Sequence, residues 1–382
     1  MKRFLKSFFT SFMIGIPFVI GLCAFMYIKS ENQKAENIEE TTISVKNLFE
    51  DTEVTFEDTS DTEIFSQPET ITCAADSVTL SFAGDVHFSE LVTQNYDKNG
   101  ISAVVDSEML SFMKNADLLI LNHEFVFSNR GEAMADKQYT LRNDPKYVKI
   151  LQELGTDVVS IANNHILDFG RDAFSDTLST LENAEISYAG GGRNLEQALS
   201  PVTKTINGQT FAIFAATRVS PSYDWYANSK RSGILQTYDA ADLNKAIKEA
   251  DTLYDHIIVF AHWGIERTET PEEYQRTLAK GYIDSGADLV IGAHPHVLQG
   301  FEYYKDVPIC YSLGNFLFGN RTGETLLLNA SFDKDGTLSI ELIPCERVNG
   351  ILSKIQEPTR LFNHLTDISF DAAVSHGGIL IQ

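Results

Sequence analysis

The sequence is poor in cysteine, with four in 382 residues. Cys23 lies in an apolar N-terminal run, which leaves Cys73, Cys310 and Cys345, and no C-x-x-C or Cys/His zinc-finger spacing occurs. The pattern therefore indicates neither a zinc finger nor a fold that depends on disulfides. Cys310 and Cys345 fall in strand-like segments, where a disulfide stays open as an alternative to the two buried free thiols that we favour.

Positive charge is also scarce, because 30 Lys and Arg stand against 53 Asp and Glu and give a formal net charge of −23. Affinity for duplex nucleic acid depends on Lys and Arg that neutralise phosphates. The composition therefore argues against nucleic acid as a partner. It also means that an anionic polymer or a phosphoester substrate requires a local cationic centre.

The N-terminus lacks charge over a run of 21 residues, 8–28, which follows Lys2, Arg3 and Lys6. A helix of that length spans about 30 Å, the thickness of a bilayer's hydrocarbon core. The run lacks an A-x-A pattern and is longer than the apolar region of a cleaved signal peptide. We interpret 1–30 as a cytoplasmic stub and a single-pass transmembrane anchor in the cell membrane, which places the following chain outside the cytoplasm. A cleaved signal peptide is the alternative and exports the same domain.

A flexible acidic stalk is expected after the anchor. Residues 31–70 contain twelve Asp and Glu against Lys34 and Lys46, and such a segment cannot bury enough apolar surface to fold. We therefore divide the chain into the anchor, a stalk at 31–75, a folded domain at 76–350 and a C-terminal extension at 351–382.

Apolar strands alternate with amphipathic helices along the folded domain. We expect strands at 77–85, 117–124, 156–165, 256–264 and 288–296, and helices at 101–116, 144–155, 171–185, 241–254 and 271–286. Asp144, Pro145 and Gly155 mark the ends of one helix, and Asn207-Gly208 predicts a hairpin within 202–217. The alternation predicts an α/β body, with a mixed sheet or a second sheet packed on the first.

Side chains suited to metal binding or acid–base chemistry gather where these strands end. The five strand ends read FAGDVH, LILNHE, SIANNH, VFAHWGIE and IGAHPH, and they carry six of the nine histidines. Ligands of open α/β sheets bind in the crevice beyond the carboxyl ends of the strands. In IGAHPH we expect an extended strand end, in which His294 and His296 point the same way and Pro295 stiffens the backbone between them.

The ligand set combines carboxylate, amide and imidazole groups and contains no thiolate. Such donors favour Mn²⁺, Zn²⁺ or Fe, and the number of imidazoles argues against Ca²⁺ or Mg²⁺ alone. The set suffices for two divalent ions about 3.5–4 Å apart, which activate water and bind a phosphoryl or carbonyl oxygen.

Seven segments, in this order, resemble the successive motifs of the CapA family of poly-γ-glutamate capsule-synthesis proteins: GDVH, NHE, ANNHILDFG, AGGGRNLEQAL, HWGIE, GAHPHVLQG and YSLGNFLF. That family in turn resembles the calcineurin-like metallophosphoesterases. The resemblance covers about residues 77–320. It implies a four-layer αββα metallophosphoesterase-like sandwich in a membrane-anchored, extracytoplasmic protein. Such a protein acts in the synthesis, export or wall attachment of polyglutamate, with a polyglutamate synthase complex as a partner.

The resemblance also implies roles for individual residues. The implied metal ligands are Asp85, His87, Glu124, Asn164, His262, His294 and His296. Glu124 is expected to bridge the two ions, with His294 and His296 supplying one imidazole for each. His165 is expected to act as general acid, because its unperturbed pKa lies near neutrality. The family commonly has an apolar or variable residue where His87 stands, so His87 favours a complete two-metal centre.

Several residues keep two interpretations. Glu266 is a candidate catalytic group or a salt-bridge partner, and Arg193 grips an anionic substrate or anchors the glycine loop. Asn122 is expected to contact substrate, whereas His123 receives no role. Asp168 is expected to cap the helix that follows it. An aromatic cluster either lines a substrate rim or packs over the core, and it consists of Tyr223, Trp225 and Tyr226.

The leading hypothesis is a metal-dependent hydrolase or transferase that serves capsule or cell-envelope polymer assembly. One alternative is a non-enzymatic, metal-stabilised accessory subunit that binds the nascent polymer or its synthase. Another is a secreted phosphoesterase unrelated to capsule.

Overall fold

The structure is a computed structural model that describes residues 77–319 and 322–382. The expected anchor at 1–30 and the expected stalk at 31–75 lie outside these residues, as does Cys73. Across the two described ranges, every helix is too short or too polar to cross a bilayer.

The first sheet has eight strands in the order β18-β17-β16-β1-β2-β5-β6, with β15 also paired to β1. Its strands are β1 (Val78–His87), β2 (Leu118–His123), β5 (Thr156–Ser160), β6 (Ser187–Ala189), β15 (Asn315–Phe318), β16 (Gly323–Phe332), β17 (Leu338–Val348) and β18 (Ile351–Lys354). β1, β2, β5 and β6 run parallel, whereas β16, β17 and β18 form an antiparallel half. The carboxyl ends of the parallel strands therefore share one edge.

The second sheet has six strands in the order β13-β14-β12-β11-β9-β8. Its strands are β8 (Val202–Ile206), β9 (Gln209–Thr217), β11 (His256–His262), β12 (Leu289–Ala293), β13 (Phe301–Tyr304) and β14 (Val307–Cys310). β9, β11, β12 and β14 run parallel, and β8 and β13 are antiparallel edges. The expected hairpin is confirmed, since Asn207 and Gly208 join β8 to β9 with positive φ angles of 50° and 81°.

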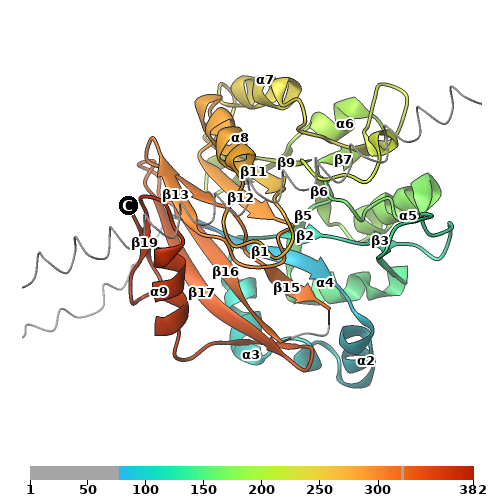
Figure 1. The fold of residues 1–382 in the computed structure, drawn as a ribbon, viewed down its shortest axis with the longest axis horizontal. Coiled ribbons are helices and arrows are strands. Elements are labelled where there is room, and N and C mark those ends of the chain that lie inside the picture. The colour runs from blue at the N-terminus through green and yellow to red at the C-terminus, as the bar shows by residue number, and fades with distance from the viewer. Residues whose placement is uncertain (1–76, 320–321) are drawn as a thin grey trace, which may run out of the picture. The chain divides into compact units, whose positions relative to one another are not determined.

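The two sheets pack face to face, and helices cover their outer faces (Figure 1). Leu80 and Phe82 of β1 point into the core between the sheets, while Ala83 and Val86 point to the helices. The helices on the first sheet are α2 (Glu90–Asn99), α3 (Ser107–Asn115), α4 (Val148–Leu154) and α5 (Gly170–Asn183); those on the second are α6 (Leu195–Leu199), α7 (Ala241–Ala250) and α8 (Glu273–Asp284). The expected α/β class is confirmed, with two sheets in a four-layer sandwich.

The expected helix at 144–155 is a 3-10 turn, Pro145–Tyr147, followed by α4. Asp144 caps the 3-10 turn by accepting a hydrogen bond from the Lys146 amide, and Gly155 ends α4 with a φ of 82°. The expected cap of α5 is wrong, because Phe169 occupies the N-cap position and no side chain caps this helix. Asp168 is instead turned toward His165, as described below.

The segment 351–382 is continuous with the body. β18 pairs with β17, and α9 (Thr359–Asp367) places Leu361, Phe362 and Leu365 in the core between the sheets. Short two-stranded pairings complete the described chain: β3 (Val126–Phe127) with β4 (Arg142–Asn143), β7 (Gly191–Gly192) with β10 (Gly233–Ile234), and β19 (Ala373–Val374) with β20 (Leu380–Ile381).

The two described cysteines are free thiols, as favoured from the sequence. Cys310 lies in the core between the sheets, whereas Cys345 lies in the core between the first sheet and its helices. The first sheet separates the two thiols, so a disulfide between them is ruled out.

Replacing Phe82 with Ala tests the packing of the two sheets. Phe82 is fully buried and its ring lies 6.5 Å from that of Phe260 on the opposite sheet. We expect F82A to lower the free energy of unfolding by about 3–5 kcal/mol, measured by denaturant titration. Tyr139→Ala is the control, because Tyr139 is 62% exposed and its loss should change stability by less than about 0.5 kcal/mol. Equal effects of the two changes would contradict the sandwich core.

Candidate metal centre

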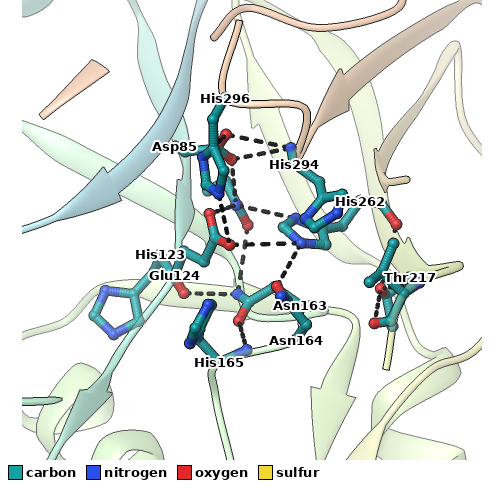
Figure 2. Close-up of polar contacts among 12 residues, drawn as sticks. Asp85, His123, Glu124, Asn163, Asn164, His165, Thr217, His262, His294 and His296 are labelled. Atoms are coloured by element: carbon teal, nitrogen blue, oxygen red, sulfur yellow. Dashed lines mark hydrogen bonds and ion pairs between the residues drawn. The ribbon is translucent and has the colours of Figure 1, made fainter. Parts of the chain in front are cut away.

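Strand ends from both sheets meet at one buried cluster of side chains (Figure 2). β1, β2 and the segment after β5 contribute from the first sheet, and β11 and the turn after β12 contribute from the second. The cluster consists of Asp85, Asn122, Glu124, Asn164, His262, His294 and His296. Residues from opposite sheets therefore share one site at the carboxyl edge of the sandwich.

A bulge at Gly84 places Asp85 in this cluster. The pairing of β1 with β2 shifts register between Ala83 and Asp85. A Cβ on Gly84 would lie 2.0 Å from the carbonyl oxygen of Gly314, so only glycine allows this approach. The Asp85 amide donates to that carbonyl at 2.9 Å, and its carboxylate accepts from Asn122 Nδ2 at 2.7 Å. The bulge and the close approach to Gly314 thus direct the fully buried Asp85 carboxylate toward the second sheet.

Glu124 follows β2 and faces Asp85 from the same sheet. Its amide donates to Val86 at 3.0 Å, and its side chain is fully buried. Glu124 Oε1 lies 3.7 Å from His262 Nε2 and 3.8 Å from His296 Nε2, yet no residue that the structure describes forms a hydrogen bond with it. A buried carboxylate oxygen without a partner needs a cation or a donor.

The turn after β12 differs from the expected extended end. β12 stops at Ala293, and His294 and His296 have φ angles of 97° and 59°. These left-handed conformations, on either side of Pro295, bring the imidazoles together by a turn rather than by the alternation of a strand. The His294 amide then donates to both Asp85 oxygens at 3.2 Å, and the two ring centroids lie 5.7 Å apart. The strained backbone is held by its contact with the Asp85 carboxylate.

His262 joins the sheets at the base of the cluster. Its Nε2 lies 2.9 Å from Asn164 Oδ1, and its Nδ1 lies 3.2 Å from Asn122 Nδ2. His296 Nδ1 lies 3.2 Å from Asp85 Oδ2 and 2.9 Å from Asn315 Oδ1. The imidazoles of His262 and His296 are therefore fixed in orientation by amides and a carboxylate.

The electrostatics of the cluster fit a bound divalent cation. Burial and the neighbouring Asp85 charge raise the pKa of Glu124 well above its usual range. Burial lowers the pKa of His294 to about 3 and that of His262 well below its usual value, which keeps both imidazoles neutral, the form that binds metals. For His296, the hydrogen bond and charge of Asp85 outweigh burial and raise the pKa.

Two groups of ligand atoms have all their members within 4.8 Å of one another: Glu124 with His294 and His296, and Asp85 with Glu124 and His262. His294 Nδ1 and Glu124 Oε1 are both buried without a hydrogen-bond partner. Glu124 belongs to both groups, and its bridging role stays a prediction. The donor set of carboxylates and imidazoles matches Mn²⁺, Zn²⁺ or Fe.

His165 lies beside the cluster in a polar network of its own. Its Nδ1 lies 2.6 Å from Asp168 Oδ2, and its amide donates to Asn163 Oδ1 at 3.0 Å. Lys137 donates to Asp168 Oδ1 and to the Asn164 carbonyl. Burial lowers the pKa of His165, although the hydrogen bond to Asp168 opposes this. Asp168 thereby fixes the orientation of the ring through Nδ1, and the role of His165 as general acid stays a prediction.

Two further predicted residues lie close to the cluster but differ from its members. His87 packs against Phe125 and Phe318, with ring centroids 5.8 and 5.4 Å away, and burial lowers its pKa to about 3. It belongs to neither group of ligand atoms, so its role as a ligand stays a prediction. Asn122 is fully buried and hydrogen-bonded to Asp85 and His262, so it orients both side chains, and its expected contact with substrate stays a prediction.

Glu266 and Arg193 lie at the surface. Glu266 is exposed in the loop after β11, and its charge raises the pKa of Glu124 and His296. Arg193 donates to both carboxylate oxygens of Glu182 on α5 and to the Tyr188 hydroxyl. This arrangement favours anchoring of the glycine loop, and a role in substrate binding stays a prediction.

The sequence did not predict the contacts that several residues make in or beside the site. The spacing H-x-x-D in NHILDFG places His165 and Asp168 on one turn of the chain, so their contact was predictable from the sequence. Lys137 comes from an irregular loop and carries no such signal. His123 is fully buried against the Phe125 and Phe127 rings, with centroids 3.9 and 4.9 Å away and both ring nitrogens lacking partners among the described residues. Burial lowers its pKa to about 3, so it packs as a neutral ring.

Comparison with known proteins places this site in a family. Residues 79–320, which hold every residue of the cluster, match the family described as bacterial capsule synthesis protein PGA_cap. The chain belongs to this family. The PGA biosynthesis protein CapA of Bacillus subtilis (strain 168) is 31% identical over 284 residues, which cover 73% of this chain and 74% of the relative.

Two other relatives of this chain have similar sequence identity. The capsule biosynthesis protein CapA of Bacillus anthracis is 29% identical over 303 residues, 76% of this chain and 73% of the relative. A protein of Mycobacterium tuberculosis (strain CDC 1551 / Oshkosh), described as a probable polyglutamine synthesis accessory protein, is 29% identical over 219 residues, 54% of this chain and 58% of the relative. The resemblance read from the seven sequence segments is confirmed.

Replacing Glu124 with Gln in this PGA_cap protein should have opposite effects with and without metal. Without metal, E124Q removes the repulsion between two buried carboxylates and should raise the melting temperature by about 2 °C or more, or roughly 1 kcal/mol. With saturating Mn²⁺ or Zn²⁺, the wild-type chain should gain about 3 kcal/mol at 100-fold excess over Kd, and E124Q should gain little. Thermal unfolding of the purified full chain in chelator and in metal measures both.

Glu249→Gln is the matched control for this change, because Glu249 lies on α7 with a 68% exposed side chain. It should respond to metal like the wild type. If E124Q melted below the wild type in chelator, or if it gained as much as the wild type from metal, the carboxylate pair would not be a cation site.

Proposed function

We propose that this chain is a metal-dependent hydrolase or transferase of poly-γ-glutamate capsule assembly, built on a metallophosphoesterase-type αββα sandwich. One observation carries the proposal. Two buried carboxylates, Asp85 and Glu124, lie among three imidazoles, and Glu124 Oε1 and His294 Nδ1 lack partners. A purely structural polar cluster would satisfy these atoms with hydrogen bonds.

The residues divide into those that hold metal and those that handle protons. Asp85, Glu124, Asn164 and the imidazoles of His262, His294 and His296 are positioned to hold one or two divalent ions. When bound, such ions activate water and polarise a phosphoryl or carbonyl oxygen. His165 protonates the leaving group from Nε2, while Asp168 holds its Nδ1.

The substrate class follows from the family and the Bacillus relatives, which are named for capsule and PGA biosynthesis. Either a phosphoester or a γ-glutamyl amide presents an oxygen that a divalent ion polarises. The chain has 53 acidic and 30 basic residues, so it repels an anionic substrate overall. A bound metal ion would supply the positive charge that such a substrate needs at the site.

An accessory role is the second candidate, and one comparison favours it. The Mycobacterium tuberculosis relative is described as an accessory protein of polyglutamine synthesis. In that case the ions stabilise a subunit that binds the polymer or its synthase without turnover. A third possibility is a phosphoesterase unrelated to capsule, which would hydrolyse phosphoesters and show no affinity for polyglutamate.

His165→Ala separates these possibilities. For an enzyme, H165A should lower turnover of a generic phosphodiester or of poly-γ-glutamate by about 10²–10⁴-fold, because a general acid is lost. Its metal content should stay at the wild-type level, since His165 lies outside both groups of ligand atoms. Steady-state rates and elemental analysis of the same preparations measure the two effects.

His364→Ala is the control, because His364 lies on α9 with a 40% exposed side chain that contacts Glu269 and belongs to neither group of ligand atoms. Its turnover should equal that of the wild type. A wild-type chain that retains metal and binds polyglutamate but turns over neither substrate would establish the accessory role instead.

The chain is also proposed to be held in the cell membrane by residues 1–30, with the stalk and the folded domain outside the cytoplasm. The support is the uncharged run at 8–28 behind three basic residues. The full chain should sediment with membranes and resist extraction by high salt. Residues 31–382 made without 1–30 should stay in the supernatant, and equal membrane association of both would contradict the anchor.

A further inference from the structure

The backbone of Arg218 contacts a residue of the candidate metal centre, and its side chain belongs to neither group of ligand atoms. It follows Thr217, the last residue of β9, and Thr217 pairs in register with His262. The Arg218 amide donates to the His262 carbonyl at 2.8 Å. The arginine therefore emerges at the carboxyl edge of the second sheet, where the strand ends form the site.

Two tyrosines hold the Arg218 side chain. Its Cζ lies 3.5 Å from the ring centroid of Tyr238 and 5.2 Å from that of Tyr274. Tyr274 is fixed in turn, because its hydroxyl accepts from the Gly264 amide at 2.6 Å, two residues after His262. Aromatic rings hold a guanidinium through cation–π contact and restrict its motion.

The Arg218 guanidinium lacks an anionic partner. Among the described residues, no carboxylate forms an ion pair with it, whereas Arg276 pairs with Glu302 and Arg193 with Glu182. Arg218 is half-buried, and the described contacts of its guanidinium are with tyrosine rings. Its hydrogen-bonding edge is available to an anion from outside the chain.

Aromatic side chains continue the rim on either side of Arg218. Tyr226 lies 6.2 Å from Tyr238 between ring centroids, and Tyr223 lies 5.2 Å from Tyr226. Tyr238 and Tyr223 are 55% and 80% exposed. The same segment reaches the His165 network, since Trp225 lies beneath the Lys137 ammonium at 5.3 Å. The aromatic cluster noted in the sequence thus connects the proton-transfer group to the arginine.

We propose that Arg218 binds a carboxylate of the polymer next to the metal centre. This inference rests on the proposed function and names the part of the substrate that the site recognises. In γ-linked polyglutamate the side-chain carboxyl forms the amide, so each residue keeps a free α-carboxylate. A guanidinium held by two tyrosine rings offers two parallel N–H groups to such a planar anion.

Binding of a fluorescently labelled poly-γ-glutamate oligomer to the full chain, with metal present, tests this proposal. We expect Arg218→Gln to weaken binding at least about tenfold, as for the loss of a charge-assisted pair. Arg218→Lys should recover part of the affinity, because it keeps the charge without the fork. Metal content of both variants should equal that of the wild type.

Arg360→Gln is the matched control, since it removes the same charge from α9, where Arg360 pairs with Glu324. It should bind the oligomer like the wild type. Polyphosphate of equal length is the second probe, and an equal loss of affinity for it in R218Q would show a general anion site and overturn the carboxylate assignment. Loss of metal in R218Q would overturn it as well, by showing that the arginine supports the centre.

The outcome for the wild type separates this inference from the proposed function. If the wild-type chain does not bind the oligomer, the polymer itself is the wrong substrate and both fail. If the wild type binds and R218Q binds equally well, the polymer stands as substrate and Arg218 is a structural contact of the rim.

Discussion

Two carboxylates buried side by side are the constraint on which this structure depends. Asp85 and Glu124 are both fully buried, and burial together with the charge of Asp85 raises the pKa of Glu124 well above its usual range. The raised pKa of His296 favours its charged form beside Asp85, whereas burial keeps His262 and His294 neutral. Among the described residues, Glu124 Oε1 and His294 Nδ1 have no hydrogen-bond partner, and we propose that a divalent cation binds beside them.

The fold is arranged to bring that pair together with ligands from another sheet. Parallel strands in each sheet end at the same edge, and face-to-face packing sets the two edges opposite each other. Two local departures from regular strands complete the geometry. A bulge at Gly84 directs Asp85 toward the second sheet, and positive φ angles at His294 and His296 direct their imidazoles toward Asp85 and Glu124. The rigid sandwich thus carries a strained site, as is common where geometry serves binding.

The parallel strands and most members of the cluster were predictable from the sequence. The parts that were not predictable depend on contacts between distant residues. Continuous apolar runs fixed the parallel strands, and their polar ends identified Asp85, Glu124, His262 and the histidine pair. Periodicity could not distinguish one mixed sheet from two, because that depends on which faces pack. The extended end expected at His294 was wrong, since contact with a distant carboxylate decides the local φ. Lys137 and Arg218 were missed because irregular loops carry no periodic signal.

Metal content is the most direct measure of the central claim. The full chain, purified without added metal, exchanged into metal-free buffer and analysed by elemental mass spectrometry, should retain one to two equivalents of Mn, Zn or Fe per chain, and Asp85→Ala should retain clearly less. A wild-type chain that carries no transition metal, and takes up none after incubation and dialysis, would contradict the account.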